Sequence, residues 1–405
     1  MMKNEARRDF LKKGLFGMAG AAMLPSAISG KMLKPSSFQP DNKLVYRKLG
    51  KTGLDIPVIS LGAGDTNNPN LVKACHEAGI RLFFSATYYG EGNNEKMLGD
   101  ALRGFPRDSF LVGTAAIPKG IDHKNGVYTK DSTREGLVKT VEDSLKRFGF
   151  DHMDFLLLPF AAKRESVFFE PLLRAMEDLK KQGKTRFIGI ASHSWVDEAL
   201  RAAADTKIYD MAMPAYNFRA ENKQAMNEAL AYATHAGLGI IAMKTQAGGY
   251  WDKERTQPIN SKATLRWVLQ NEHVTSAVSG MSKFEELQQN LALMSDLKLT
   301  GQDMKDLKLA YNEGTPGLYC KQCRKCIPQC KRNLDIPTLM RSYMYAYGYR
   351  NLEHAQHTLI ASGITGNPCG NCSSCDIKCT SGFNVREKIQ DIARLQDVPA
   401  DLIKV

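Results

Sequence analysis

Eight of the nine cysteines in this 405-residue chain lie in two short runs near its C-terminus. The spacing C-x2-C-x2-C-x3-C occurs twice, at Cys320, Cys323, Cys326 and Cys330, and again at Cys369, Cys372, Cys375 and Cys379. Three thiolates in one tight loop can bind three irons of a cubane, while the fourth ligand comes from elsewhere in the chain. The duplicated spacing therefore predicts two [4Fe–4S] clusters.

Zinc and disulfides are the alternative uses of these cysteines. A structural zinc site usually takes two ligands from each of two CxxC pairs, which leaves the third cysteine of each run without a role. Disulfides suit an exported protein with many cysteines. Neither alternative accounts for the spacing as completely as a pair of clusters does.

The two runs resemble those of two-cluster ferredoxins, in which the fourth cysteine of each run binds the other cluster. The resemblance implies two ligand sets, Cys320, Cys323, Cys326 with Cys379, and Cys369, Cys372, Cys375 with Cys330. Residues 335–363 between the runs have helical character, as in the helical dicluster domains of larger redox enzymes. Residues 313–405 are therefore expected to form a small, mainly α-helical, ferredoxin-like iron–sulfur domain.

The connector between the cysteine runs also carries aromatic and histidine residues. Its four tyrosines are expected to pack rather than to relay electrons; they are Tyr343, Tyr345, Tyr347 and Tyr349. His354 and His357 share a helix face but have no third ligand, which predicts a polar surface and not a metal site.

The N-terminal 29 residues have the pattern of an export signal. An Arg-Arg pair at positions 7 and 8 precedes Phe-Leu-Lys and an apolar run from Leu15 to Ile28, which is too short for a transmembrane helix. This resembles a twin-arginine signal cleaved near Gly30, which implies export of the folded protein to the periplasm or another extracytoplasmic compartment. No stable membrane anchor is expected after cleavage. A chance arginine pair in an amphipathic helix is the alternative.

The formal net charge of +12 could suggest an acidic partner, but part of it lies in the N-terminal segment. Thiolates that bind iron would lower it further. No basic run with interleaved aromatic residues appears, so nucleic-acid binding is not expected. The expected partners are a redox partner protein or a small-molecule substrate.

The segment from residue 44 to 312 alternates short apolar runs with amphipathic stretches. Eight runs predict strands, at residues 58–62, 80–84, 109–113, 153–158, 185–190, 209–213, 238–243 and 275–280. Eight strand–helix units predict an α/β fold, the (β/α)8 TIM barrel, with residues 46–58 as a hairpin over its floor. A doubly wound sheet would need a glycine-rich turn after the first strand, and Gly62-Ala63-Gly64 supplies only part of one.

Five segments of this region carry a family resemblance: KLGKTGLDIPVISLG, ATYYGEGNNEKMLGDAL, GKTRFIGIASHS, GLGIIAMKTQAGG and SGMSKFEELQQNLAL. They resemble aldo-keto reductases over residues 44–295. Such enzymes transfer hydride between a nicotinamide cofactor and a carbonyl, with a tyrosine as proton donor. A lysine, an aspartate and a histidine assist the tyrosine.

The resemblance assigns the tyrosine to Tyr89 but leaves it without these partners. The positions of the aspartate, lysine and histidine hold Phe84, Ala115 and Pro159, and Met213 lies near the position of a glutamine that contacts nicotinamide. Without a cationic neighbour, a tyrosine in apolar surroundings is a poor acid–base group at neutral pH. Ordinary carbonyl reduction at Tyr89 is therefore disfavoured.

Two other side chains at strand ends are the replacement acid–base candidates. His193 follows the fifth strand and Lys244 follows the seventh, and a buried salt-bridge role is the alternative for each. The expected catalytic residues are accordingly Tyr89, Lys244 and His193.

Segments that hold the cofactor in this family are partly retained. Ser192 and His193 stand where a carboxamide-binding pair is expected, and a loop and helix for the adenosine phosphate match Ser279, Gly280, Ser282, Lys283 and Asn290. NADP(H) binding is therefore one expectation, and βα-loop residues inherited with the fold are the other.

Three functions follow from these patterns. The first is an exported iron–sulfur oxidoreductase of aldo-keto reductase type, with electrons passed through two clusters and non-standard chemistry in the barrel. The second is a non-catalytic electron-transfer or docking subunit. The third is an NADPH-dependent carbonyl reductase, which requires Tyr89 to act without its partners.

Overall fold

The computed structural model describes residues 44–312 and 317–403. The expected export signal at residues 1–29 lies outside the described residues. In the described part of the chain, no helix combines the length and apolar character needed to cross a membrane.

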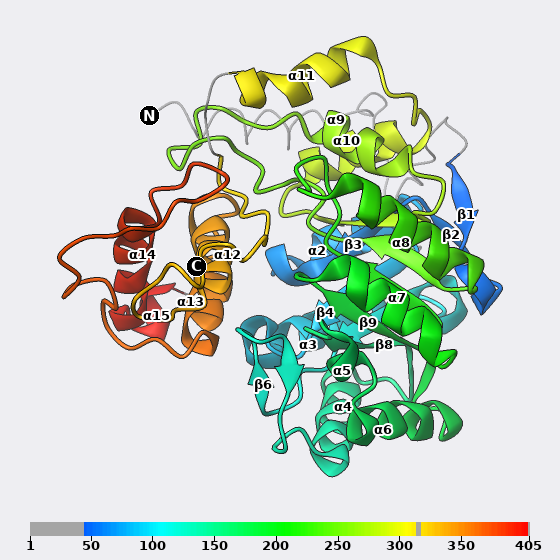
Figure 1. Cartoon of the computed structure of the whole chain (residues 1–405). Coiled ribbons are helices and arrows are strands. Elements are labelled where there is room, and N and C mark those ends of the chain that lie inside the picture. The colour runs from blue at the N-terminus through cyan, green and yellow to red at the C-terminus, as the bar shows by residue number, and fades with distance from the viewer. Residues whose placement is uncertain (1–43, 313–316, 404–405) are drawn as a thin grey trace, which may run out of the picture. The chain divides into compact units, whose positions relative to one another are not determined.

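Eight parallel strands close into a barrel in the order β10-β11-β12-β3-β4-β5-β8-β9 (Figure 1). The strands are β3 Ile59–Gly62, β4 Leu82–Ala86, β5 Leu111–Ala115, β8 Met153–Pro159, β9 Thr185–Ser192, β10 Met211–Pro214, β11 Gly239–Ala242 and β12 Ser276–Gly280. The predicted TIM barrel is therefore confirmed. Each strand expected from the sequence coincides with a barrel strand, with ends that differ by about two residues at most.

Helices follow most strands along the chain. They are α2 Pro69–Glu77, α3 Asn93–Leu102, α4 Arg134–Phe148, α5 Arg164–Val167, α6 Glu170–Lys181, α7 Val196–Thr206, α8 Lys223–His235, α9 Ser261–Leu269, α10 Phe284–Met294 and α11 Gly301–Asn312. Helix α4 shows how local residues begin and end these helices. The Thr133 side chain accepts a hydrogen bond from the Gly136 N–H at its start, and Gly149 ends it in the left-handed region at φ 69°.

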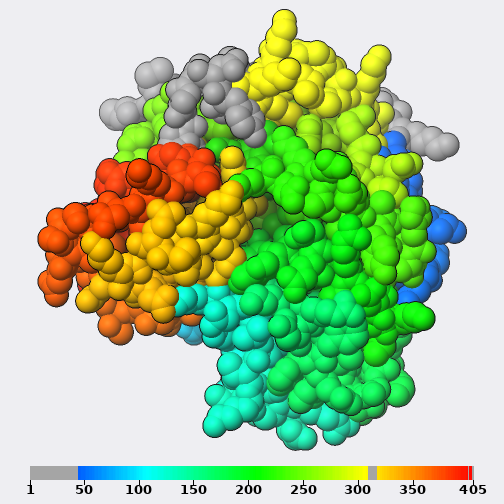
Figure 2. All heavy atoms as spheres, viewed as in Figure 1, coloured from blue at the N-terminus to red at the C-terminus, as the bar shows by residue number. Residues whose placement is uncertain are grey.

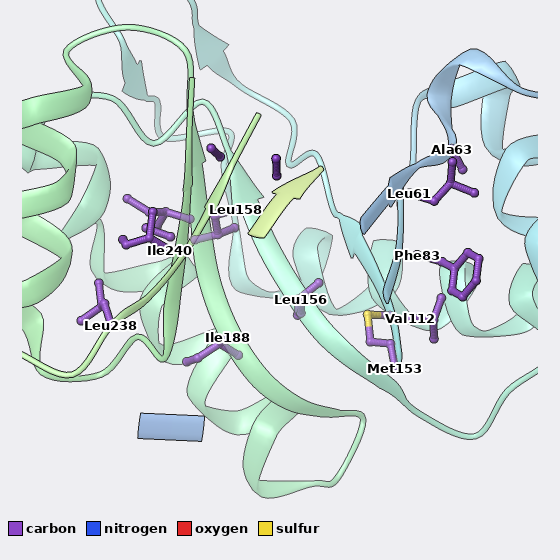
Figure 3. Packing of buried hydrophobic residues seen from close by; sticks show 14 of the residues in the cluster. Leu61, Ala63, Phe83, Val112, Met153, Leu156, Leu158, Ile188, Leu238 and Ile240 are labelled. Atoms are coloured by element: carbon purple, nitrogen blue, oxygen red, sulfur yellow. The ribbon is translucent and has the colours of Figure 1, made fainter. Parts of the chain in front are cut away.

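Alternating strand residues separate the core into an outer and an inner cluster. On β4, Phe83 points outward and packs among the helices, as do Leu156 and Leu158 on β8 (Figure 3). Phe84 lies in the inner cluster, which fills the barrel interior. The two-residue period of a strand thus fixes which side chains reach the barrel mouth.

The predicted floor hairpin is also present. Strand β1 (Tyr46–Lys48) pairs antiparallel with β2 (Asp55–Pro57). The Lys51 N–H donates to the Gly237 carbonyl at 2.8 Å, just before β11, and Leu49 joins the inner cluster. The hairpin therefore closes the barrel at the amino ends of its strands, opposite the mouth. A second hairpin, β6 (Ile121–Asp122) with β7 (Val127–Tyr128), follows β5.

The C-terminal part is mainly helical, as expected. Its helices are α12 Ile336–Tyr347, α13 Leu352–Ala361, α14 Val385–Ala393 and α15 Ala400–Ile403. Figure 2 shows the gold and orange surface of this part beside the green surface of the barrel.

An apolar cluster joins the C-terminal helices to loops of the barrel. Phe218 and Trp251 from the barrel share this cluster with Leu318 and Met344. The two backbones meet closely, because a Cβ on Gly348 would lie 2.4 Å from the Gly248 carbonyl oxygen. The helical part is therefore packed against the barrel along the chain segment that leaves β11.

Candidate active site and cluster ligands

The carboxyl ends of the barrel strands open into a cavity of about 680 Å³. Its floor is apolar and includes Phe84, Ala115, Leu157, Pro159 and Met213. The Phe84 ring occupies space that a larger residue on β5 would fill, since a Cβ on Gly113 would lie 2.4 Å from the Phe84 Cε1 atom. The volume suits a small organic ligand, and the floor offers it no charge.

Tyr89 lies on the wall of this cavity, directly after β4, where it opens the short 3-10 helix η3 (Tyr89–Gly92). Its ring is held against η2 (Ala63–Asp65), because a Cβ on Gly64 would lie 2.7 Å from the Tyr89 Cε2 atom. Burial raises the pKa of Tyr89 well above its usual 10, and the neighbouring Tyr88, Tyr345 and Asp65 raise it further. Tyr89 thus remains a protonated phenol that can donate a hydrogen bond.

Lys244 follows β11 and also lines the cavity. Its backbone is in the left-handed region at φ 57°, and its carbonyl accepts a hydrogen bond from Asn217 Nδ2 at 3.0 Å. A non-glycine residue in this region carries strain that the surrounding structure must maintain. Burial lowers the pKa of Lys244 to about 8, although the negative charge of Asp65 opposes the change. Near neutral pH, Lys244 can therefore both give and accept a proton.

Asp65 at the end of η2 is the acidic neighbour of Lys244. Burial raises the pKa of Asp65, while Lys244 and a hydrogen bond from Asn351 act in the opposite direction. Asn351 Nδ2 donates to Asp65 Oδ1 at 3.1 Å and to the Gly64 carbonyl at 2.8 Å. The sequence pattern does not single out Asp65, which directly follows the partial glycine-rich turn Gly62-Ala63-Gly64 after β3.

His193 lines the cavity from the end of β9, as expected. Its Nδ1 atom is buried without a hydrogen-bond partner in the described residues, and its ring stacks on Phe160 at 5.6 Å between centroids. Burial, followed by the charges of Arg341 and Lys244, lowers the pKa of His193 well below 6.5. His193 is therefore a neutral imidazole at physiological pH. Ser192 is buried, and its hydroxyl donates to the Ser194 carbonyl at 2.7 Å.

The expected nucleotide residues lie on another wall of the same cavity, namely Ser279, Gly280, Ser282, Lys283 and Asn290. The backbone N–H groups of Ser282 and Lys283, just before α10, donate to the Glu286 carboxylate at 2.7 and 3.1 Å. An anionic ligand would compete with Glu286 for these N–H groups.

The C-terminal part also lines the cavity, with Gly348, Tyr349 and His354. The expectation of a polar surface at His354 is wrong. The His354 ring stacks on Tyr345 at 3.9 Å and meets Tyr89 edge-on at 5.0 Å, and the His357 ring stacks on Tyr88 at 5.2 Å. The physical reason is that α13 packs against the barrel mouth, which no local pattern in the helix indicates.

The tyrosines of the connector pack, as expected. Tyr343 and Tyr345 are buried, and the Tyr349 hydroxyl accepts a hydrogen bond from the Gly248 N–H at 3.2 Å. Tyr345 and Tyr349 both approach Lys244, whose Nζ lies 4.4 and 6.0 Å from their ring centroids.

The structure brings each expected cysteine set together, and all eight thiols are free. Burial and then the nearby Cys326, Cys379 and Cys323 raise the pKa of Cys320 to about 12. Burial and then Cys372, Cys330 and Cys375 raise the pKa of Cys369 to about 11. Among the described residues, no group of His, Cys, Asp or Glu is placed to hold a single metal ion.

The donor sets fit iron–sulfur clusters. Four thiols crowded together resist deprotonation, and the iron of a bound cluster would favour their thiolate forms by offsetting the negative charge. Cys330 reaches the second set from the first run, and the two runs are joined by a hydrogen bond from the Lys378 N–H to Gln329 Oε1 at 2.7 Å.

Two family models match separate parts of the chain. Residues 64–264 match the aldo/keto reductase family, and residues 319–384 match the 4Fe-4S dicluster domain. The chain therefore contains an aldo/keto reductase domain and a C-terminal 4Fe-4S dicluster domain.

Several relatives of the reductase barrel are named as oxidoreductases. L-galactose dehydrogenase of Arabidopsis thaliana is 27% identical over 65% of this chain and 92% of its own length. L-glyceraldehyde 3-phosphate reductase of Escherichia coli (strain K12) is 24% identical over 68% of this chain and 95% of its own length. An aldo-keto reductase from Klebsiella pneumoniae, solved in complex with NADPH, is 23% identical over 67% of this chain and 95% of its own, with a TM-score of 0.52. The last comparison establishes the fold.

The dicluster domain and the reductase barrel also enclose a small cavity of about 10 Å³, which records the close approach of their side chains. Its lining includes His193 and Lys244 from the barrel, and Cys320 and Arg341 from the dicluster domain. Nearby, Ser194 Oγ donates to Gln322 Oε1 at 3.1 Å. One cysteine of the first set therefore borders the same space as two acid–base candidates, whereas Cys375 of the second set is exposed.

Proposed function

We propose that this protein is an exported iron–sulfur oxidoreductase whose substrate binds in the mouth of the reductase barrel. The observation that carries the proposal is the small cavity shared by Cys320, His193 and Lys244. A [4Fe–4S] cluster at Cys320, Cys323, Cys326 and Cys379, and a second at Cys330, Cys369, Cys372 and Cys375, would supply one-electron transfer.

The barrel residues would bind the substrate and control its protons. Lys244, with a pKa of about 8, is the group that can deliver or remove a proton near neutral pH. Tyr89 and His193 are neutral, so each can hydrogen-bond a substrate oxygen without adding charge. The apolar floor keeps water away from the reacting atoms.

The usual carbonyl reduction of the family is not the chemistry that these residues favour. Phe84, Ala115 and Pro159 supply no carboxylate, ammonium or imidazole beside Tyr89. An oxyanion that forms near Tyr89 would lack the lysine and the histidine that the family resemblance expects at positions 115 and 159. Lys244 approaches from β11 instead, so a proton would reach the substrate from a different side of the barrel.

NADP(H) is proposed as a second ligand of the same cavity. The support is that Ser279, Lys283 and Asn290 line this cavity together with Tyr89 and Lys244. Titration of the purified protein with NADPH, followed by nicotinamide fluorescence, tests this. Lys283→Ala should weaken binding, whereas Lys298→Ala, which lies outside the cavity lining, should not. Absence of binding by the wild type at millimolar NADPH would remove the nucleotide from the proposal.

Anaerobic purification with iron and sulfide analysis tests the main proposal. About eight irons per chain and two electron paramagnetic resonance signals after reduction are expected for two clusters. The reduced protein should then be reoxidised by a substrate that binds in the barrel. Fewer irons would contradict the proposal. Full iron content, no turnover and a stoichiometric redox partner in the preparation would instead favour a non-catalytic electron-transfer or docking subunit.

Export is supported by the Arg-Arg pair at positions 7 and 8 and the apolar run that follows. Replacement of both arginines by lysine should retain the protein in the cytoplasm of a bacterial host. Equal amounts of wild type and variant outside the cytoplasmic membrane would contradict this part of the proposal.

A further inference from the structure

His354 of the dicluster domain faces the reductase pocket with its hydrogen-bonding capacity unused. Its ring lines the same cavity as Tyr89 and Lys244. Within residues 44–312 and 317–403, neither ring nitrogen makes a hydrogen bond, and neither is sealed from solvent as His193 Nδ1 is. A histidine that served only as packing would not need to keep a donor and an acceptor available in a cavity.

Both domains fix the orientation of this ring. Tyr345 stacks on one face at 3.9 Å between centroids, and Tyr89 meets the ring at an interplanar angle of 64°. The backbone N–H of His354 donates to Asn351 Oδ1 at 3.0 Å, and Asn351 Nδ2 in turn bonds Gly64 and Asp65 of the barrel. The start of α13 is therefore tied to the loop that carries Asp65, so His354 has a defined position relative to the pocket.

The charges around His354 keep it neutral. Burial lowers its pKa well below 6.5, and Lys244, His357 and Arg341 lower it further. The ring also contacts the uncharged phenol rings of Tyr88, Tyr89 and Tyr345. A neutral imidazole donates a hydrogen bond from one nitrogen and accepts one at the other, which suits the oxygen of an uncharged carbonyl or alcohol.

We propose that His354 is a substrate-binding residue of the reductase pocket, where its ring donates a hydrogen bond to the carbonyl or hydroxyl oxygen of a small uncharged substrate. The inference rests on the proposed function only in that the substrate occupies the barrel mouth. The dicluster domain then has two tasks, because it holds the cluster ligands and it completes the binding site. Lys244, which lines the same cavity after β11, is positioned for the proton, and His354 for the oxygen.

Binding of glyceraldehyde, a small carbonyl compound, to the holoprotein with both clusters oxidised tests this proposal. Isothermal titration would measure the dissociation constants of the wild type and of three variants. His354→Phe keeps a ring between Tyr345 and Tyr89 but removes both nitrogens, and about a tenfold weaker binding is expected for one lost hydrogen bond. His354→Gln restores a donor and should recover most of this loss.

His357→Phe is the matched control, because His357 lies on the same helix and stacks on Tyr88 but does not line the cavity. Its dissociation constant should stay within about twofold of the wild type, since no hydrogen bond to the ligand is lost. Wild-type affinity in His354→Phe, an equal loss in His357→Phe, or no binding by the wild type would each overturn the proposal. Iron content and the resonance spectra of the reduced variants report whether the fold is intact. Since no electron transfer is involved, a failure of the proposed redox function would leave these binding results unchanged.

Discussion

The Nζ atom of Lys244 lies 4.4 Å from the centroid of the Tyr345 ring, so a barrel residue and a residue of the dicluster domain meet at the pocket wall. A ring face attracts the ammonium without removing its charge. The Tyr345 ring also shields the Lys244 ammonium from water, and burial is the main cause of the lowered pKa of Lys244. The acid–base strength of this lysine therefore depends on a neighbouring domain.

Replacement of Lys244 by methionine should abolish most turnover while the pocket keeps its shape. The wild type should show a change in rate centred near pH 8, where Lys244 titrates. In Lys244→Met this inflection should be absent, and the residual rate should be lower by about 100-fold or more. Rate measurements from pH 6 to 10 would check this, and an unchanged inflection in the variant would assign it to another group.

The same substitution should change how stability depends on pH. The pKa of Lys244 is about 8 in the folded protein, against 10.5 for a free lysine. Between these two pH values the unfolded chain binds more protons at Lys244 than the folded protein does. The free energy of unfolding linked to Lys244 is therefore highest above pH 10.5, and it decreases as the pH falls through about 8. The thermal midpoint of the wild type relative to Lys244→Met should therefore rise with pH from 8 to 10.5. A constant difference would contradict the lowered pKa.

Tyr89→Phe should have a modest effect. The Tyr89 phenol stays protonated because burial raises its pKa, so its loss removes one hydrogen bond and no acid–base group. A decrease in kcat/KM of about tenfold is expected, with an unchanged pH profile. A loss of several orders of magnitude would show that Tyr89 acts as the proton donor after all.

A carboxylate at position 84 should destabilise the barrel. Phe84 is 4% exposed and its neighbours in the inner cluster are apolar. Phe84→Asp leaves a buried charge without a partner and a cavity, and we expect a cost of about 3–5 kcal/mol in the free energy of unfolding. Phe84→Leu should cost less, about 1–2 kcal/mol. Thermal unfolding monitored by circular dichroism compares the two, and equal midpoints would contradict the apolar environment.

Single cysteine variants should reveal the crossed ligand sets. Cys320→Ala and Cys379→Ala should remove the same resonance signal, although the two residues lie in different runs. Cys330→Ala should remove the other signal, because Cys330 lies with Cys369. Cys75→Ala, in the barrel core, should leave both signals in place. Loss of the same signal in Cys330→Ala and Cys320→Ala would show that each run binds its own cluster.

The close backbone contact between the domains should leave no room for a side chain at position 348. A Cβ on Gly348 would lie 2.4 Å from the Gly248 oxygen, whereas a Cβ on Gly104 would meet nothing within 4 Å. Gly348→Ala should therefore displace α12 from the barrel and lower the thermal midpoint by several degrees, about 1–3 kcal/mol in stability. Gly104→Ala should differ little from the wild type.

The sequence alone predicts the barrel well, because each strand carries its own apolar run and each is followed by a helix or turn of suitable length. The resemblance of the two cysteine runs to those of two-cluster ferredoxins implies the cysteine sets. Phe84, Ala115 and Pro159 line the pocket as expected from their strand ends.

The rest of the site depends on contacts between distant parts of the chain. Asp65 meets Asn351, and Tyr89 meets His354, across more than 260 residues of sequence. No helical period or local motif in α13 indicates which barrel loop it will contact. The interpretation of His354 as polar surface failed for this reason. His354 is separated from the pocket residues in sequence, and only the packing of the two domains brings it there.

The two hydrogen bonds from Asn351 to Gly64 and Asp65 hold the start of α13 against the barrel mouth. Any movement that draws α13 away would let water reach Lys244 and return its proton affinity toward that of an ordinary lysine. The same movement of α13 would also withdraw His354 from the pocket. Substrate entry and proton chemistry would thus depend on the same contact, which is made by the domain that holds the cysteine ligand sets.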